Sequence, residues 1–177
     1  VALSFEGVGQ GFTGPSGTFN LTGAPPDTNG DVGPNHYVQT VNQALVIWDK
    51  AGTKLRGPLP INTLFQSLGG LCAADNDGDP VVLYDNAANR WFISQFAVTN
   101  PNPNYHQCIA VSQTGDPTGA YNAYDFTYSA FNDYGKAGVW SDGYYFTYNM
   151  FTGGTTFAGA KVCAFNRTAM LSGAAAT

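Results

Sequence analysis

Beyond Pro34 the chain consists of short apolar runs separated by turn residues at intervals of about 8–12 residues, a spacing typical of all-β folds. No long stretch shows the 3.6-residue period of a helix. Turns are expected at 49–52, 86–89 and 141–143, where Asp, Asn and Gly gather. The pattern predicts strands over residues 36–41, 44–48, 80–85, 90–97, 108–112, 120–128, 137–140, 144–150 and 157–165, and a single helical turn over 168–171.

The predicted strands fall into groups over residues 36–66, 79–128 and 137–171, each containing a hairpin. Units of four strands are typical of β-propeller blades, and a closed ring needs about 4–8 of them. We therefore expect an all-β chain with antiparallel four-stranded sheets as in β-propeller blades, about three blades, in an incomplete propeller. A sandwich, or a ring completed by further chains, is the alternative. Residues 1–26 are expected to form an extended arm with a strand near 18–21, and residues 27–177 a single domain.

Composition narrows the function classes. The chain has 7 basic and 12 acidic residues, a net charge of −5, and only 11% charged residues. So few bases cannot form a cationic face for nucleic acid. No apolar run is long enough to span a membrane, and a hydrophobic content of 44% argues against disorder. Few charges and 10 Tyr favour a secreted protein.

The cysteines leave two interpretations open. In a secreted chain two of Cys72, Cys108 and Cys163 would pair and leave one over, whereas three free thiols is the alternative. Asn20 and Asn166 each match the glycosylation pattern, which matters only for a eukaryotic source.

Two acidic segments suggest metal binding. Residues 27–31 and 75–79 both place oxygen-bearing side chains at every second position, with Gly before the last. Ca²⁺ prefers six to eight oxygen ligands, and the first five positions of an EF-hand loop share this spacing, although its closing Glu is missing here. We expect one Ca²⁺ in each segment, or else plain turns and strand caps. The candidate ligands are Asp27, Asn29, Asp31, Asp75, Asp77 and Asp79.

No nucleophile elbow, zinc-protease helix, phosphate loop or dinucleotide fingerprint occurs in the chain. Glycan binding has looser requirements, since it needs aromatic faces with polar groups beside them. The candidates that would face such a ligand are His36, Arg90, Trp91, Trp140 and Tyr144. The alternative is that the aromatic residues lie in the core, that Arg90 pairs with a neighbouring strand and that His36 is a hydrogen-bonded strand end.

Several runs in their order resemble a family of large secreted bacterial proteins, described as sialidase-like or β-propeller-like and mostly of unknown function. The runs are PPDTNGDVGPNHYVQ at 25–39, NDGDP at 76–80 with VLYD at 82–85, RW at 90–91 with SQF at 94–96, CIAVSQTGDPTG at 108–119, DY at 133–134, GVW at 138–140 and DGYY at 142–145.

The resemblance implies an extracellular propeller-type module and covers only the N-terminal half of such a propeller. Sialidases use an Arg triad, a Tyr/Glu pair and an Asp. Here the Arg residues are Arg56, Arg90 and Arg167, and Glu6 is the single Glu, so a complete sialidase site is not expected.

Three hypotheses follow. The first is a secreted, calcium-stabilised binding or structural module at the cell surface. The second is a glycoside hydrolase that uses carboxylates such as Asp79, Asp85 or Asp142. The third is a self-assembling subunit, whose open sheet edges pair with a second copy or with the remainder of a longer chain.

Overall fold

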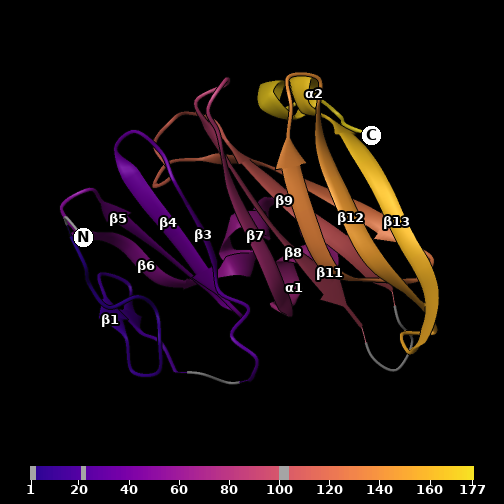
Figure 1. The fold of residues 1–177 in the computed structure, drawn as a ribbon, viewed down its shortest axis with the longest axis horizontal. Coiled ribbons are helices and arrows are strands. Elements are labelled where there is room, and N and C mark those ends of the chain that lie inside the picture. The colour runs from indigo at the N-terminus through magenta and orange to yellow at the C-terminus, as the bar shows by residue number, and fades with distance from the viewer. Residues whose placement is uncertain (1–2, 21–22, 100–103) are drawn as a thin grey trace.

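The structure is a computed structural model that describes residues 3–20, 23–99 and 104–177. In this described part the chain forms three antiparallel sheets and one short hairpin, which confirms the all-β class. Figure 1 shows the sheets following one another across the molecule from the indigo N-terminal side to the yellow C-terminal side. Among the described residues, no helix has the length and apolar character needed to cross a lipid bilayer.

Each sheet is a meander in which every strand pairs with the next along the chain. The first sheet contains β3 (Asn29–Val32), β4 (His36–Val41), β5 (Ala44–Asp49) and β6 (Lys54–Pro60). The second contains β7 (Gly78–Asp85), β8 (Arg90–Val98), β9 (Tyr105–Ser112) and β10 (Tyr121–Tyr128). The third contains β11 (Phe131–Val139), β12 (Gly143–Thr152) and β13 (Thr156–Asn166), followed by α2 (Arg167–Ser172).

The first strands of the three sheets are neighbours, because β7 packs against β3 on one side and against β11 on the other. Two backbone N–H groups of β7 donate to side chains of β3: Val82 to Asn29 Oδ1 at 2.7 Å and Tyr84 to Asp31 Oδ2 at 2.7 Å. Residues 29–31 and 78–79 of the two acidic segments therefore belong to strands and not to turns.

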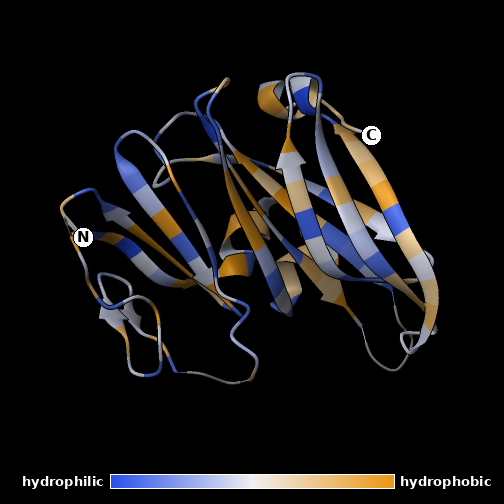
Figure 2. Cartoon of the chain, in the orientation of Figure 1, coloured by the Kyte–Doolittle hydropathy of each residue, from blue (hydrophilic) through white to orange (hydrophobic). Residues whose placement is uncertain are grey.

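Two apolar cores separate the sheets. Strand β8 contributes side chains to both cores, because successive side chains of a strand point to opposite faces of the sheet. Trp91 and Ile93 enter the core between the first and second sheets, and Phe92 enters the core between the second and third. Figure 2 shows apolar and polar residues succeeding one another along the strands.

A helical segment that the hydrophobic pattern did not predict closes the first core. It comprises η1 (Ile61–Leu68) and α1 (Gly70–Ala74), and it buries Ile61, Phe65 and Cys72. The apolar residues of η1 follow the helical spacing i, i+3, i+4 and i+7 at Ile61, Leu64, Phe65 and Leu68, but over eight residues only, too short a run for the period alone to establish a helix. A disulfide joins Cys72 to Cys108 of β9, so the pairing alternative is confirmed and Cys163 is a free thiol.

The N-terminal arm packs against the first sheet. It carries the hairpin of β1 (Thr13–Gly14) and β2 (Gly17–Thr18), and the Ser16 N–H donates to the carbonyl of Gly57 in β6 at 3.1 Å. The strand expected near 18–21 is present only as far as Thr18, and residues 21–22 lie outside the described residues. The rings of Phe5 and Phe12 lie 5.8 and 5.9 Å from that of Trp48.

Candidate functional site

The two acidic segments meet where the first strands begin. Asp27 and Asp79 both have left-handed backbone conformations, with φ of 40° and 45°, and the side chain of Asn42 is hydrogen-bonded to both residues. Asp tolerates this conformation better than most residues. A cavity of about 90 Å³ lies here, lined by the two aspartates together with Thr28, Asn29, Pro80, Tyr134 and Lys136. We call this region the acidic junction.

The hydrogen bonds at the acidic junction hold its carboxyl groups together. The side chain of Asn42 donates to Asp27 Oδ2, and its own Oδ1 accepts from the Asp79 N–H at 2.9 Å. The Tyr134 N–H donates to Asp79 Oδ2 at 3.1 Å, which brings β11 to the same point.

Burial, followed by the nearby carboxylates of Asp27 and Asp133, raises the pKa of Asp79 to about 6. Burial and Asp27 also raise the pKa of Asp133, against the opposing effect of Lys136. The junction therefore gathers the carboxyl groups of Asp27, Asp79 and Asp133, with Lys136 as a cation beside them.

Of the remaining predicted metal ligands, Asn29 also lines this cavity, whereas Asp31, Asp75 and Asp77 do not. The side chains of Asn29 and Asp31 accept hydrogen bonds from backbone N–H groups of β7. They can do so in a row because alternate residues of an extended strand project to the same side. Asp77 accepts a hydrogen bond from the Val98 N–H at 2.8 Å, and burial, with a smaller effect of Asp75, raises its pKa. The structure thus brings Asp27 and Asn29 of the first segment together with Asp79 of the second instead of forming two separate ligand sets.

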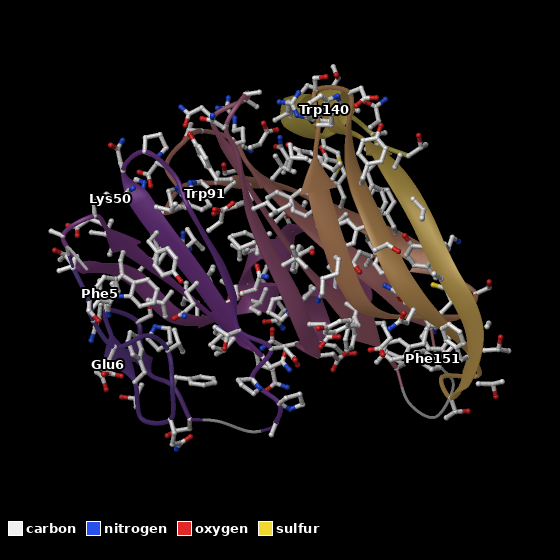
Figure 3. The ribbon with its side chains drawn as sticks, in the orientation of Figure 1. Phe5, Glu6, Lys50, Trp91, Trp140 and Phe151 are labelled. Carbon is white, nitrogen blue, oxygen red and sulfur yellow. A yellow bond between two sulfur atoms is a disulfide. The ribbon has the colours of Figure 1, made fainter. Side chains whose placement is uncertain are left out.

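A cleft lies at the opposite end of the first strands, between the β7–β8 turn and the β11–β12 turn. Its volume is about 400 Å³, and its lining includes Trp140, with Tyr84, Asp85, Asn86, Ala87, Val139 and Ser141. The Trp140 side chain is 71% exposed. Figure 3 shows it at the end of the third sheet beside α2, away from Trp91. We call this region the Trp140 cleft.

Beneath this cleft, Asp85 forms a buried ion pair with Arg167. The distances are 2.6 Å from Arg167 Nε to Asp85 Oδ2 and 2.9 Å from Nη2 to Oδ1. The Tyr144 hydroxyl and the Ala88 N–H also donate to Asp85, each at 3.0 Å. Burial opposes ionisation of Asp85, but these hydrogen bonds outweigh it and lower its pKa. The pair joins β7 to α2 and β12, and so fixes the floor of the cleft.

The other residues expected to face a ligand do not form an open surface. Trp91 and Tyr144 are almost fully buried, because each fills a core between two sheets. Arg90 Nη1 donates to the carbonyls of Ala88 and Asn89 within its own turn. His36 Nε2 lies 3.9 Å from a carboxylate oxygen of Asp116. Of the five candidates, Trp140 alone presents a broad aromatic face to solvent.

Two carboxylates of the hydrolase hypothesis, Asp79 and Asp85, are not arranged as a catalytic pair. Asp79 and Asp85 lie at opposite ends of β7, six residues apart and therefore separated by about 20 Å. Glycosidases need about 5–10 Å between their carboxyl groups. Asp85 is bound to Arg167, and the exposed Asp142 accepts a hydrogen bond from the Tyr145 hydroxyl at 2.9 Å.

Sequence reasoning missed a polar pair beside the disulfide. His106 Nδ1 and Asp125 Oδ1 are 2.7 Å apart. A ring nitrogen of His106 and a carboxylate oxygen of Asp125 also lie within 4.8 Å of the Cys72 sulfur, so the three residues could in principle bind a metal ion. That sulfur is bonded to Cys108 and is not a thiolate, so it offers no metal ligand. Only the β9–β10 pairing, in which these strands run antiparallel, brings the two residues together.

Comparison with known proteins finds no match: no family model, no curated protein and no solved structure is detectably similar to this chain.

Proposed function

We propose that this chain is a secreted β-propeller-type binding module that recognises a glycan at the Trp140 cleft. The observation that carries the proposal is a tryptophan, 71% exposed, at the rim of a cleft of about 400 Å³. The Cys72–Cys108 disulfide supports secretion, because such bonds persist in oxidising compartments.

The arrangement of the sheets supports the propeller type. In a propeller, each blade is a meander whose first strand lies nearest the central axis. Here the first strands β3, β7 and β11 lie side by side, and later strands of each sheet follow outward in chain order. The three sheets then represent consecutive blades, and the Trp140 cleft lies at the ends of two axial strands, β7 and β11.

The chemistry of the cleft supports a sugar ligand. An exposed indole face is costly to keep in water and stacks readily on the apolar face of a pyranose ring. Asn86 and Ser141 supply polar groups beside the indole, as expected for a site that is mostly apolar with a few polar groups fixing orientation. The buried Asp85–Arg167 pair holds the two turns of the cleft in place before any ligand arrives.

Tryptophan fluorescence tests the proposal directly. The chain has three Trp, and Trp48 and Trp91 are both 0% exposed, so an emission change on binding reports on Trp140. Titration with a panel of neutral and acidic oligosaccharides should give a saturable change that Trp140→Ala abolishes. Phe157→Ala is the matched control, because Phe157 is 62% exposed and lies on β13, outside the cleft. No response to any sugar, or a response that survives Trp140→Ala, would overturn the proposal.

A second candidate function is calcium binding at the acidic junction. The carboxyl groups of Asp27, Asp79 and the nearby Asp133 form a set of hard oxygen donors, the kind that Ca²⁺ prefers. A bound divalent ion would also offset the repulsion from Asp27 and Asp133, which adds to the effect of burial in raising the pKa of Asp79. One ion at Asp27 and Asp79 fits the structure better than the two separate ions expected from the sequence.

Thermal unfolding in EDTA and in excess Ca²⁺ tests this candidate. Ca²⁺ should raise the melting temperature of the natural chain and not that of Asp79→Asn, while Asp142→Asn, a change at an exposed carboxylate in a turn, keeps the full response. Equal melting temperatures in EDTA and Ca²⁺ would exclude a calcium site of useful affinity.

A further inference from the structure

The polar pair beside the disulfide belongs to a larger group of donor atoms. The group comprises the side chains of Cys72, His106, Cys108 and Asp125, and we call it the disulfide cluster. None of these residues lines the Trp140 cleft or the acidic junction. The cluster therefore needs an explanation of its own.

Three of the four donors lie on one face of the second sheet. His106 and Cys108 are alternate residues of β9, so their side chains project to the same face. Asp125 of β10 is the register partner of Cys108, and directly opposite residues of an antiparallel pair share a face. The pairing of β9 with β10 thus gathers an imidazole, a carboxylate and a cysteine sulfur.

The fourth donor comes from α1, which packs against β9. The sulfur of Cys72 lies within 4.8 Å of a ring nitrogen of His106 and of a carboxylate oxygen of Asp125. The Cys108 sulfur is bonded to that of Cys72 and so lies beside it. Two sulfur atoms, one nitrogen and one oxygen are therefore close neighbours.

The disulfide takes up both sulfur atoms in the oxidised chain. Before it forms, Cys72 and Cys108 are thiols, each of which can lose a proton to become a thiolate. Two thiolates, a neutral imidazole and a carboxylate are ligands that Zn²⁺ takes in tetrahedral sites. Ca²⁺ prefers oxygen ligands, so the disulfide cluster differs in kind from the acidic junction.

The spacing of the donors suits an ion of this size. Zn²⁺ binds sulfur at about 2.3 Å and nitrogen or oxygen at about 2.0–2.2 Å, so the ligands of a tetrahedral site lie about 3–4 Å apart. His106 Nδ1 and Asp125 Oδ1 are 2.7 Å apart, and the distances from these two residues to the Cys72 sulfur are at most 4.8 Å. Side-chain shifts of about 1 Å bring the three donors to the required spacing.

Burial differs between the two halves of the cluster. Cys72 and Cys108 are 0% exposed, whereas the side chains of His106 and Asp125 are 15% and 27% exposed. An ion from solvent therefore reaches the sulfur atoms by way of the imidazole and the carboxylate, and the first core shields its other side.

We propose that the chain binds one Zn²⁺ at the disulfide cluster while the Cys72–Cys108 bond has not yet formed. Binding releases the two thiol protons and holds α1 on β9, as the disulfide does in the oxidised chain. When a disulfide oxidant accepts two electrons from the two thiolates, the Cys72–Cys108 bond forms and Zn²⁺ is released. The oxidant takes up two protons and becomes a pair of thiols. The cluster is a metal site in one redox state and a cross-link in the other.

Titration with Co²⁺ tests the site, because tetrahedral Co²⁺ bound to thiolates absorbs visible light. The chain is reduced with a dithiol in urea, refolded without oxygen and separated from the dithiol. The reduced chain should develop thiolate–Co²⁺ bands that saturate at one ion per chain, and added Zn²⁺ should abolish them. The oxidised chain should develop none, and because it keeps the free thiol of Cys163 it also controls for that residue.

Variants at the solvent-facing half of the cluster test the other two ligands. His106→Ala and Asp125→Asn should each weaken Co²⁺ binding to the reduced chain by about tenfold or more. Thr127→Ala is the matched control, because Thr127 is the exposed register partner of His106 on β10 and its hydroxyl is not among the usual zinc ligands. This variant should bind Co²⁺ as tightly as the natural chain.

Alkylation of the natural chain provides a second measurement that requires no variant. In the reduced chain Zn²⁺ should slow the alkylation of Cys72 and Cys108 and leave that of Cys163 unchanged, as followed by peptide mass spectrometry. Equal Co²⁺ bands in the oxidised chain, full affinity in both His106→Ala and Asp125→Asn, alkylation of Cys72 and Cys108 that Zn²⁺ does not slow, or a reduced chain that stays unfolded in Zn²⁺ would each overturn the proposal.

Discussion

The buried ion pair between Asp85 and Arg167 offers the sharpest test of how the third sheet is attached to the second. Asp85 is 1% exposed and accepts four hydrogen bonds, two of them from Arg167. Asp85→Asn keeps the shape of the side chain but leaves the guanidinium of Arg167, itself 8% exposed, without its counter-charge. Loss of one partner from a buried pair typically costs about 3–5 kcal/mol.

For a chain of this length each kcal/mol changes the melting temperature by about 2–4 °C, so Asp85→Asn should lower it by roughly 6–20 °C. Urea denaturation followed by tryptophan fluorescence gives the free energy of unfolding. Asp142→Asn is the control, because Asp142 is exposed and its loss should cost about 0.5 kcal/mol or less. Hydrogen exchange of Asp85→Asn should show β11, β12 and β13 losing protection before the first sheet.

A double variant separates the charge from the shape. Adding Arg167→Met to Asp85→Asn removes the unpaired cation and should recover part of the lost stability, while the amide oxygen introduced by Asp85→Asn still accepts from the Tyr144 hydroxyl. Because the pKa of Asp85 is lowered, its stabilising effect is present above the unfolded pKa of about 3.9 and is lost as the pH falls through its folded value. A loss below about 1 kcal/mol, or no recovery in the double variant, would refute the reasoning.

Three further changes test other parts of the structure by urea denaturation. Because the pKa of Asp79 is raised to about 6, its stabilising effect is full below the unfolded value of about 3.9 and is lost as the pH rises through about 6. In EDTA, Asp79→Asn should flatten that decline, and an unchanged pH dependence would contradict it. Replacing Cys72 and Cys108 by Ala removes a cross-link with a sequence separation of 36 and should lower the free energy of unfolding by about 3–4 kcal/mol. A loss near zero would mean that the disulfide does not stabilise the fold. Gly33→Ala should cost about 1–3 kcal/mol because its Cβ would lie 2.9 Å from a buried ring atom, while Gly138→Ala, with open space around it, should be nearly neutral; equal effects would count against the packing of this site.

The amino-acid sequence by itself determined the fold class and most of the strands, although β3, β6 and the first half of β11 were not predicted. Runs such as 36–41, 80–85 and 90–97 combine apolar residues with flanking turns, and local backbone preference suffices to make them strands. The turn at 49–52 is likewise local, since Asp49 Oδ1 accepts from the Ala51 and Thr53 N–H groups at 2.8 Å each. The exposure of Trp140 was among the open alternatives, because this residue ends the predicted strand 137–140 and directly precedes the predicted turn at 141–143.

Tertiary structure decided which side chains meet. Asp27 and Asp79 are 52 positions apart, and only the packing of β3 beside β7 makes them neighbours. The same packing assigns Asn29 and Asp31 to backbone donors of β7, which no spacing within residues 27–31 reveals. Trp91 and Tyr144 are buried because sheets cover both faces of β8 and one face of β12, and a period of two cannot tell how many faces are covered. Burial and long-range pairing are properties of the assembled chain, whereas strand propensity is a property of each segment.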